Sequence, residues 1–193
     1  PKVAPTPVVE PPSVMAAVPG RPKREGRGKT LAIFSPKGGV GRSLLATNLA
    51  IALRAPADKK VVLVDCSLQF GDIGVLLNLA SNYSIANLAD KKGQMDSELL
   101  DVILTPHISG IKVLLSPPHP EQAEMLTPDH MRELLTTLQS MFDYVIVDMW
   151  PSLQELSLTV LDLADRILLV TTPDIPSIKN ARLFFEVTDA LGY

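Results

Sequence analysis

Short apolar runs alternate with longer, mostly helix-compatible segments from Thr30 to the end of the 193-residue chain. The runs are rich in Val, Ile and Leu and do not alternate with polar residues, which predicts strands buried on both faces. Such strands require helices on both sides of a parallel sheet, so we predict a three-layer α/β fold. The expected strands are residues 31–35, 61–65, 111–115, 144–148 and 166–171.

The segments between these runs predict the helices. Residues 43–53 would place small or apolar side chains on nearly every face of a helix, so we expect a buried helix there. Asp96 is expected to cap a second helix. A third helix should start near Thr127, because a proline follows it and apolar residues then recur at a period of 3.6. The remaining helices are expected over residues 156–164 and 177–191, with Gly192 as the last C-cap.

Residues 1–29 differ from the rest, because prolines punctuate them and apolar periodicity is absent. We predict a flexible linker or tail there, before a domain over residues 30–193. The linker ends in a basic cluster of Arg21, Lys23, Arg24, Arg27 and Lys29. A solvated linker end is favoured over a phosphate-binding contact, since Glu25 interrupts the cluster. Because the chain begins with Pro1 instead of Met, we expect a fragment of a longer protein.

Composition narrows the classes of function. A hydrophobic fraction of 46% suffices for a core, and a net charge of −3 gives no argument for nucleic acid or an anionic membrane. A single cysteine, Cys66, excludes an internal disulfide and fits a reducing cytoplasm. It follows a buried strand, so we expect it to be inert packing. No apolar run approaches the roughly 20 residues of a membrane span.

A glycine-rich stretch from Ser35 to Ser43, with the sequence SPKGGVGRS, joins the first expected strand to the first expected helix. Glycines let backbone N–H groups curl around an anion, and the helix N-terminus adds partial positive charge. Asp65 and Asp148 end two other strands, as Ser35 ends the first. Because ligands bind beyond the carboxyl ends of parallel strands, these residues predict one phosphate-binding site.

The strict phosphate-loop pattern G-x-x-x-x-G-K-[ST] fails at Pro36 and at Arg42. The stretch Lys37–Ser43 nevertheless resembles the deviant Walker A motif, K-G-G-x-G-K-[ST], of the MinD/ParA family of P-loop ATPases. Asp148, at the end of an apolar strand, resembles the Walker B acid of that family. The resemblance covers residues 30–193 and implies a P-loop NTPase fold that is incomplete at its C-terminus.

The resemblance implies ATP or ADP with Mg²⁺ as ligands. Ser43 and Asp148 would hold the metal, and Lys37 would reach the partner's nucleotide in an ATP-sandwiched homodimer. Lys37, Arg42 and Asp65 form the implied catalytic set. The implied nucleotide contacts are Lys37, Gly38, Gly39, Val40, Gly41, Arg42, Ser43 and Leu44. The segment Asp174–Ser177 is a weaker candidate for a wall of the nucleotide site.

Two departures from the family pattern fall on the chemistry. Arg42 keeps the positive charge of the usual lysine but is longer, planar and forked, so either the loop adjusts, or the affinity for phosphate falls and Arg42 points elsewhere. Ser67 replaces the second acid of a D-x-D pattern, and a hydroxyl cannot accept a proton at neutral pH. Asp72 could substitute, although a structural role is favoured. We therefore expect nucleotide binding with slow or undetectable ATP hydrolysis.

Trp150 and the three histidines are the remaining candidates for chemistry or contacts. Trp150 stands where the family tends to have proline, and an exposed partner contact and a partly buried packing role are equally open. His107, His119 and His130 lack the spacing of metal ligands, so we assign them no chemistry.

Three stretches, residues 65–72, 114–124 and 169–174, resemble the CpaE/TadZ branch of the family, which serves pilus assembly. This resemblance implies a cytoplasmic switch, recruited to the cell pole or inner membrane face, with pilus or secretion assembly proteins as partners. A pseudo-ATPase scaffold is the first alternative, favoured by Arg42 and Ser67. A ParA-like DNA-partition ATPase is the second, but the acidic chain gives no reason to expect a specific nucleic acid. Membrane association stays open.

Overall fold

The structure is a computed structural model that describes residues 27–55 and 59–192. The predicted linker over residues 1–29 falls almost entirely outside the described residues, as do Arg21, Lys23 and Arg24 of the basic cluster. Within the described ranges, no helix has both the length and the apolar character that crossing a membrane requires.

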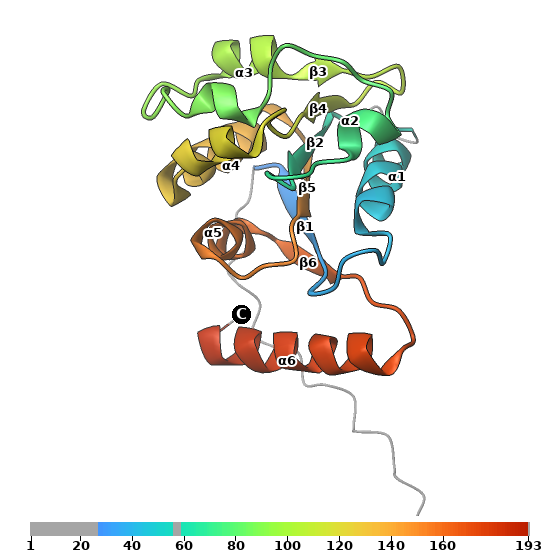
Figure 1. Cartoon of the computed structure of the whole chain (residues 1–193). Coiled ribbons are helices and arrows are strands. Elements are labelled where there is room, and N and C mark those ends of the chain that lie inside the picture. The colour runs from blue at the N-terminus through green and yellow to red at the C-terminus, as the bar shows by residue number, and fades with distance from the viewer. Residues whose placement is uncertain (1–26, 56–58, 193) are drawn as a thin grey trace, which may run out of the picture.

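A six-stranded sheet with the order β3-β4-β2-β5-β1-β6 runs through the molecule (Figure 1). Every neighbouring pair is parallel except β3 and β4, which pair antiparallel at one end. The prediction of a mostly parallel three-layer α/β fold is confirmed. The strands are β1 Lys29–Phe34, β2 Val61–Cys66, β3 Thr105–Pro106, β4 Lys112–Leu114, β5 Tyr144–Met149 and β6 Arg166–Leu169.

Helices cover both faces of the sheet. Figure 1 shows α1 and α2 on one side, α4 and α5 on the other, and α6 lying across the end beyond β6. The helices are α1 Arg42–Arg54, α2 Ile73–Leu76, α3 Ser97–Ile103, α4 Pro128–Met141, α5 Glu155–Leu163 and α6 Ile175–Leu191. Two short 3₁₀ helices are Ile85–Leu88, between α2 and α3, and Pro120–Met125, between β4 and α4.

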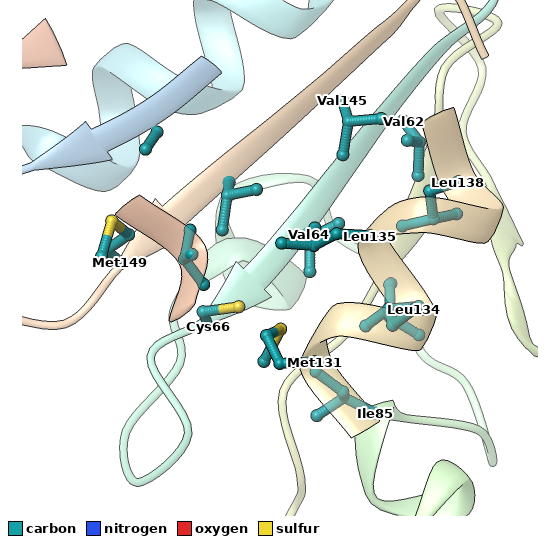
Figure 2. Packing of buried hydrophobic residues seen from close by; sticks show 14 of the residues in the cluster. Val62, Val64, Cys66, Ile85, Met131, Leu134, Leu135, Leu138, Val145 and Met149 are labelled. Atoms are coloured by element: carbon teal, nitrogen blue, oxygen red, sulfur yellow. The ribbon is translucent and has the colours of Figure 1, made fainter. Parts of the chain in front are cut away.

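The larger part of the core lies between the sheet and helices α4 and α5. The apolar stripe of α4 packs toward β2 and β5, as the sequence period predicts (Figure 2). Cys66 is fully buried in this cluster, and burial raises the pKa of its thiol well above the ordinary value. The expectation that Cys66 is packing is confirmed. A smaller cluster beneath α1 includes Ile33, Leu63 and Ile146.

Three of the expected helix ends have the caps that the sequence indicates, whereas α6 begins at Ile175, two residues before the predicted start. Asp96 accepts a hydrogen bond from the Leu99 N–H at the start of α3. Thr127 and His130 cap α4 reciprocally, which gives the buried His130 a structural task. Gly192 ends α6 with φ 78°, a left-handed conformation that glycine adopts without strain.

The structure departs from the sequence expectations at the sheet edge and on α1. The expected burial of α1 is wrong for Leu44 and Leu45, which are 56% and 44% exposed, because only one stripe of the helix faces the sheet. Strand β6 is an edge strand, and Leu168 is 39% exposed. Elements β3 and α2 were not predicted, since two to four residues are too few to show a period.

Candidate functional site

The loop of residues 35–41 joins the end of β1 to the start of α1. Gly39 and Gly41 have φ angles of 75° and 86°, which favour glycine. A Cβ added at Gly38, Gly39 or Gly41 would meet no atom within 4 Å, so the loop faces open space. Among the described residues, the N–H groups of residues 38–41 have no acceptor. Together with the first turn of α1, they form a cradle suited to an anion.

Strand register brings the two predicted carboxylates to this loop. Asp148 at the end of β5 is paired with Ile33 of β1 on one side and with Asp65 of β2 on the other. Both aspartates are fully buried, and Ser35 follows β1 directly. The predicted convergence of Ser35, Asp65 and Asp148 at adjacent strand ends is therefore present.

Arg42, the first residue of α1, bridges two of these strand ends. Its Nε donates a hydrogen bond to Asp148 Oδ1 at 2.7 Å, and its Nη2 donates to Ser67 Oγ at 2.9 Å. The Arg42 side chain is 12% exposed and the Asp148 side chain is fully buried, so solvent screens this ion pair weakly. Of the two alternatives that the sequence leaves open, the structure has the one in which Arg42 points away from the loop.

Two oxygen atoms at this site suit a magnesium ion. Asp148 Oδ2 is buried without a hydrogen-bond partner in the described part of the chain, an arrangement that a metal-bound water would satisfy. Ser43 Oγ, one residue after Arg42, has no hydrogen-bond partner there either. Carboxylate and hydroxyl oxygens are the hard ligands that Mg²⁺ prefers. Both oxygens are therefore of the kind that the implied metal takes, while Arg42 already pairs with the other oxygen of Asp148.

The carboxyl group of Asp65 organises the loop that follows β2. It accepts hydrogen bonds from the N–H groups of Ser67 and Ile73 at 3.0 and 3.3 Å. Burial raises the pKa of Asp65 to about 7, helped by the nearby charge of Asp148 and opposed by the hydrogen bonds, including one from Ser116. Asp72, by contrast, is exposed, and its side chain makes no capping hydrogen bond to α2.

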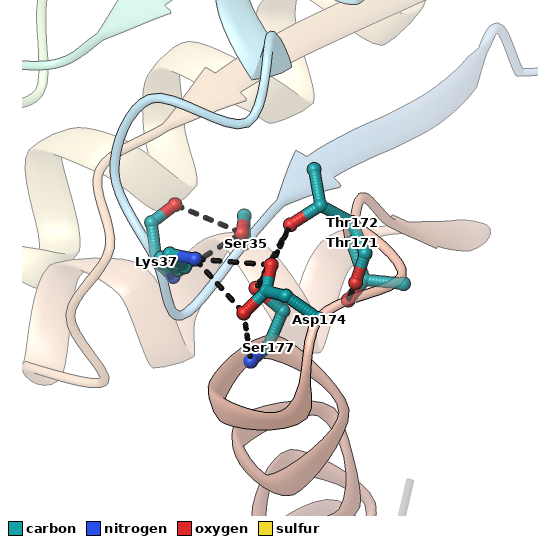
Figure 3. Close-up of polar contacts among 6 residues, drawn as sticks. All are labelled: Ser35, Lys37, Thr171, Thr172, Asp174 and Ser177. Atoms are coloured by element: carbon teal, nitrogen blue, oxygen red, sulfur yellow. Dashed lines mark hydrogen bonds and ion pairs between the residues drawn. The ribbon is translucent and has the colours of Figure 1, made fainter.

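Lys37 pairs with Asp174, the residue before α6 (Figure 3). Its Nζ lies 3.1 Å from each carboxylate oxygen. Asp174 also caps α6 by accepting from the N–H and hydroxyl of Ser177, and it accepts from the Thr172 hydroxyl. Hydrogen bonds from Thr172 and Ser177, and then from Lys37, hold the pKa of Asp174 well below its usual range. This pairing was not predicted, although Asp174 followed by Ser177 is a helix-capping signal.

A cavity of about 600 Å³ opens beside Arg42 and Ser67. Phe70, which is 81% exposed, and Trp150 also line it. Trp150 is half-buried and packs against the larger core. Of the two interpretations left open for Trp150, the partly buried packing role therefore describes its environment.

The profile of the AAA_31 family, described as an AAA domain, matches residues 28–191 of the chain, which include the glycine loop. The chain belongs to the AAA_31 family. Its glycine loop and strand order are those of the MinD/ParA type of P-loop domain.

Individual relatives of the AAA_31 domain agree with this assignment. The septum site-determining protein MinD of Thermotoga maritima is 26% identical over 168 residues, covering 86% of this chain and 60% of MinD. A ParA family ATPase from Chlorobium tepidum TLS superposes with a TM-score of 0.79 at 29% identity, covering 84% of this chain and 68% of that one. The chain spans about 60% of the length of the curated relatives it matches.

A third relative has been solved with a ligand. MinD of Pyrococcus horikoshii OT3, complexed with Mg-ADP, superposes on the AAA_31 domain with a TM-score of 0.73. It is 21% identical, and the match covers 86% of this chain and 66% of that one. At this identity the likeness shows the shared fold.

Proposed function

We propose that this domain binds ATP or ADP with Mg²⁺ and acts as a nucleotide-dependent dimerising switch. The observation that carries the proposal is the loop of residues 35–41, whose N–H groups face open space beside the start of α1. A phosphate in this cradle would receive several N–H donors and the positive end of the α1 dipole. The Mg-ADP complex of the similar MinD supports this choice of ligand.

The chain's own residues divide the work of binding. Residues 38–44 would donate backbone N–H groups to the phosphates, and Ser43 with Asp148 would hold the metal. Bound Mg²⁺ neutralises phosphate charge and orients the nucleotide. Lys37 would contact the nucleotide of a second copy of the chain after leaving Asp174, which makes dimerisation depend on nucleotide.

We further propose that this switch hydrolyses ATP weakly. Phosphoryl transfer depends on positioning and on charge stabilisation around the phosphate. Arg42 is held by Asp148 and Ser67 instead of pointing into the loop, so its charge is directed away from the phosphates. Ser67 supplies no carboxylate to orient a water. Both features remove contributions that hydrolysis requires.

The biological role that we propose is the positioning of a pilus or secretion assembly. Support comes from the resemblance of residues 65–72, 114–124 and 169–174 to the pilus-assembly branch. Residues of the first two stretches, including Phe70 and Glu124, line the cavity beside Arg42. Such a surface would let a partner respond to the state of the nucleotide site.

Calorimetry with ATP·Mg²⁺ and with ADP tests the proposal, with Gly41→Val as the variant. Valine resists the φ of 86° at position 41, so the cradle should distort and affinity should fall at least about tenfold. Sizing with and without ATP should show a dimer only with ATP. Absence of binding by the unmodified protein would contradict the proposal.

A pseudo-ATPase scaffold is the second candidate, and the Arg42–Asp148 ion pair favours it, because Asp148 already has a positive partner without any bound metal. A scaffold would keep the same oligomeric state and the same partner binding whether or not nucleotide is present. Salt-sensitive retention on DNA would instead indicate a partition ATPase.

A further inference from the structure

The Arg42–Asp148 contact places a fixed positive charge on a carboxylate proposed to hold the metal. The Nε–Oδ1 distance of 2.7 Å is that of a strong charge-assisted hydrogen bond. Asp148 lies in the middle of the sheet with its side chain fully buried. A buried carboxylate needs a compensating charge, and Arg42 supplies it from within the chain.

A second anchor fixes the direction of the guanidinium. Arg42 Nη2 donates to Ser67 Oγ at 2.9 Å, and Ser67 is itself only 8% exposed. The Ser67 N–H donates in turn to Asp65, so the anchor belongs to an ordered loop. A guanidinium has the forked geometry to hold both partners at once, whereas a lysine ammonium is a single point charge.

This arrangement bears directly on the metal. The oxygens that suit Mg²⁺ are Asp148 Oδ2 and Ser43 Oγ, and Ser43 is the neighbour of Arg42 in the chain. A divalent cation near Asp148 would meet a carboxylate that Arg42 has already neutralised, and it would be repelled by the guanidinium. The metal and the arginine therefore compete for one acid.

We propose that Arg42 is a built-in counter-cation for Asp148 that makes nucleotide binding by this domain nearly independent of Mg²⁺. The inference rests on the proposed nucleotide binding and adds a cofactor preference to it. Arg42 acts through Asp148, so it is a positioning residue, and a lysine at the same place would return Asp148 to the metal.

The experiment compares ADP affinity, by calorimetry on the full chain, in excess Mg²⁺ and in EDTA. For each protein the readout is the ratio of the two dissociation constants, which cancels any effect of residue 42 on phosphate binding that is the same with and without Mg²⁺. We expect less than about a threefold change for the unmodified protein and at least about a tenfold change for Arg42→Lys. Arg182→Lys is the matched control, because this exposed arginine lies on α6 and pairs with Glu186, one turn further along the same helix.

Ser67→Ala is the second variant, used also if Arg42→Lys does not fold. It removes one anchor of the guanidinium and leaves the charge, so its ratio should lie between those of the other two proteins.

A tenfold dependence on Mg²⁺ in the unmodified protein would overturn the inference while leaving nucleotide binding intact. Equal ratios in the unmodified protein, Arg42→Lys and Ser67→Ala would also overturn it. Failure of the unmodified protein to bind ADP in either condition would instead overturn the proposed function, so the two failures are distinguishable.

Discussion

The ammonium group of Lys37 lies 3.1 Å from both carboxylate oxygens of Asp174, 137 positions further along the chain (Figure 3). The pair joins the phosphate loop to the start of α6. If Lys37 reaches a second subunit's nucleotide, as we propose, it must first leave Asp174. This contact then favours the monomer.

Asp174→Asn tests that relationship. Asparagine is as good an N-cap as aspartate, so α6 should keep its start while Lys37 loses its charged partner. Because the pair is partly exposed, its loss should lower the protein concentration needed for ATP-dependent dimerisation by no more than about fivefold. Sedimentation with ATP measures the change.

Asp129→Asn is the control for this variant, because Asp129 also accepts from basic side chains but lies in the first turn of α4. It should leave dimerisation unchanged. Weaker dimerisation of Asp174→Asn than of the unmodified protein would show that the pair does not restrain Lys37.

Asp65 should make stability depend on pH. Its pKa is about 7 in the folded protein, whereas the ordinary value, which applies to the unfolded chain, is 3.8. The folded state therefore binds the proton more tightly. The free energy of unfolding should therefore fall as pH rises from about 4 to about 7, and this contribution should be constant above. Asp65→Asn should remove it.

Urea titrations at several pH values, without nucleotide or metal, measure this effect as the difference between the unmodified protein and Asp65→Asn. The difference isolates Asp65 from other groups. One of these is Asp174, whose pKa is lowered in the folded protein, so its stabilising contribution is lost only in acid, as the pH falls below the ordinary pKa of an aspartate. Parallel pH profiles for the two proteins would contradict the prediction.

Gly71→Ala should destabilise the loop after β2. A Cβ at this position would come closer to Ser116 Oγ and Asp65 Oδ2 than van der Waals contact allows. The side chains would have to move apart, at a cost of about 1–3 kcal/mol in the free energy of unfolding. Urea denaturation measures it.

Gly74→Ala provides the matched comparison, because a Cβ there meets its nearest atoms at 3.5 and 3.6 Å, which is ordinary contact. Position 74 is helical, so alanine should be neutral or stabilising by up to about 1 kcal/mol. Equal effects of the two substitutions on the free energy of unfolding would show that Ser116 and Asp65 do not prevent a side chain at position 71.

The pair of substitutions Arg42→Lys and Ser67→Asp should raise ATP turnover. The first frees Asp148 from its ion pair, and the second adds a carboxylate where Ser67 now accepts from Arg42. General base catalysis contributes about a hundredfold or more, so we expect at least a tenfold increase over the unmodified protein. Phosphate release measures turnover.

Each single variant should give a smaller increase than the pair. Ordinary turnover by the unmodified protein, abolished by Gly41→Val, would contradict the premise that hydrolysis is weak. No gain in the double variant, despite retained ADP binding, would show that Arg42 and Ser67 are not what limits hydrolysis.

Much of the architecture could be predicted because it depends on local patterns. The unbroken apolar runs of β2 and β5 indicated strands buried on both faces, and every residue of β2 is buried. Thr127 followed by Pro128 marked the start of α4. The short strand β3 and the exposure of Leu44 could not be predicted, because both depend on which other elements pack beside these residues in the folded protein.

The sequence by itself determined the succession of the longer strands and helices along the chain, the glycine loop and the placing of acids at strand ends, since these follow from residue type and spacing. Only the tertiary structure decided where the charges go. Arg42 meets Asp148 across 106 positions, and Lys37 meets Asp174 across 137. Long charged side chains take partners that the fold brings within reach, and no local period encodes such partners.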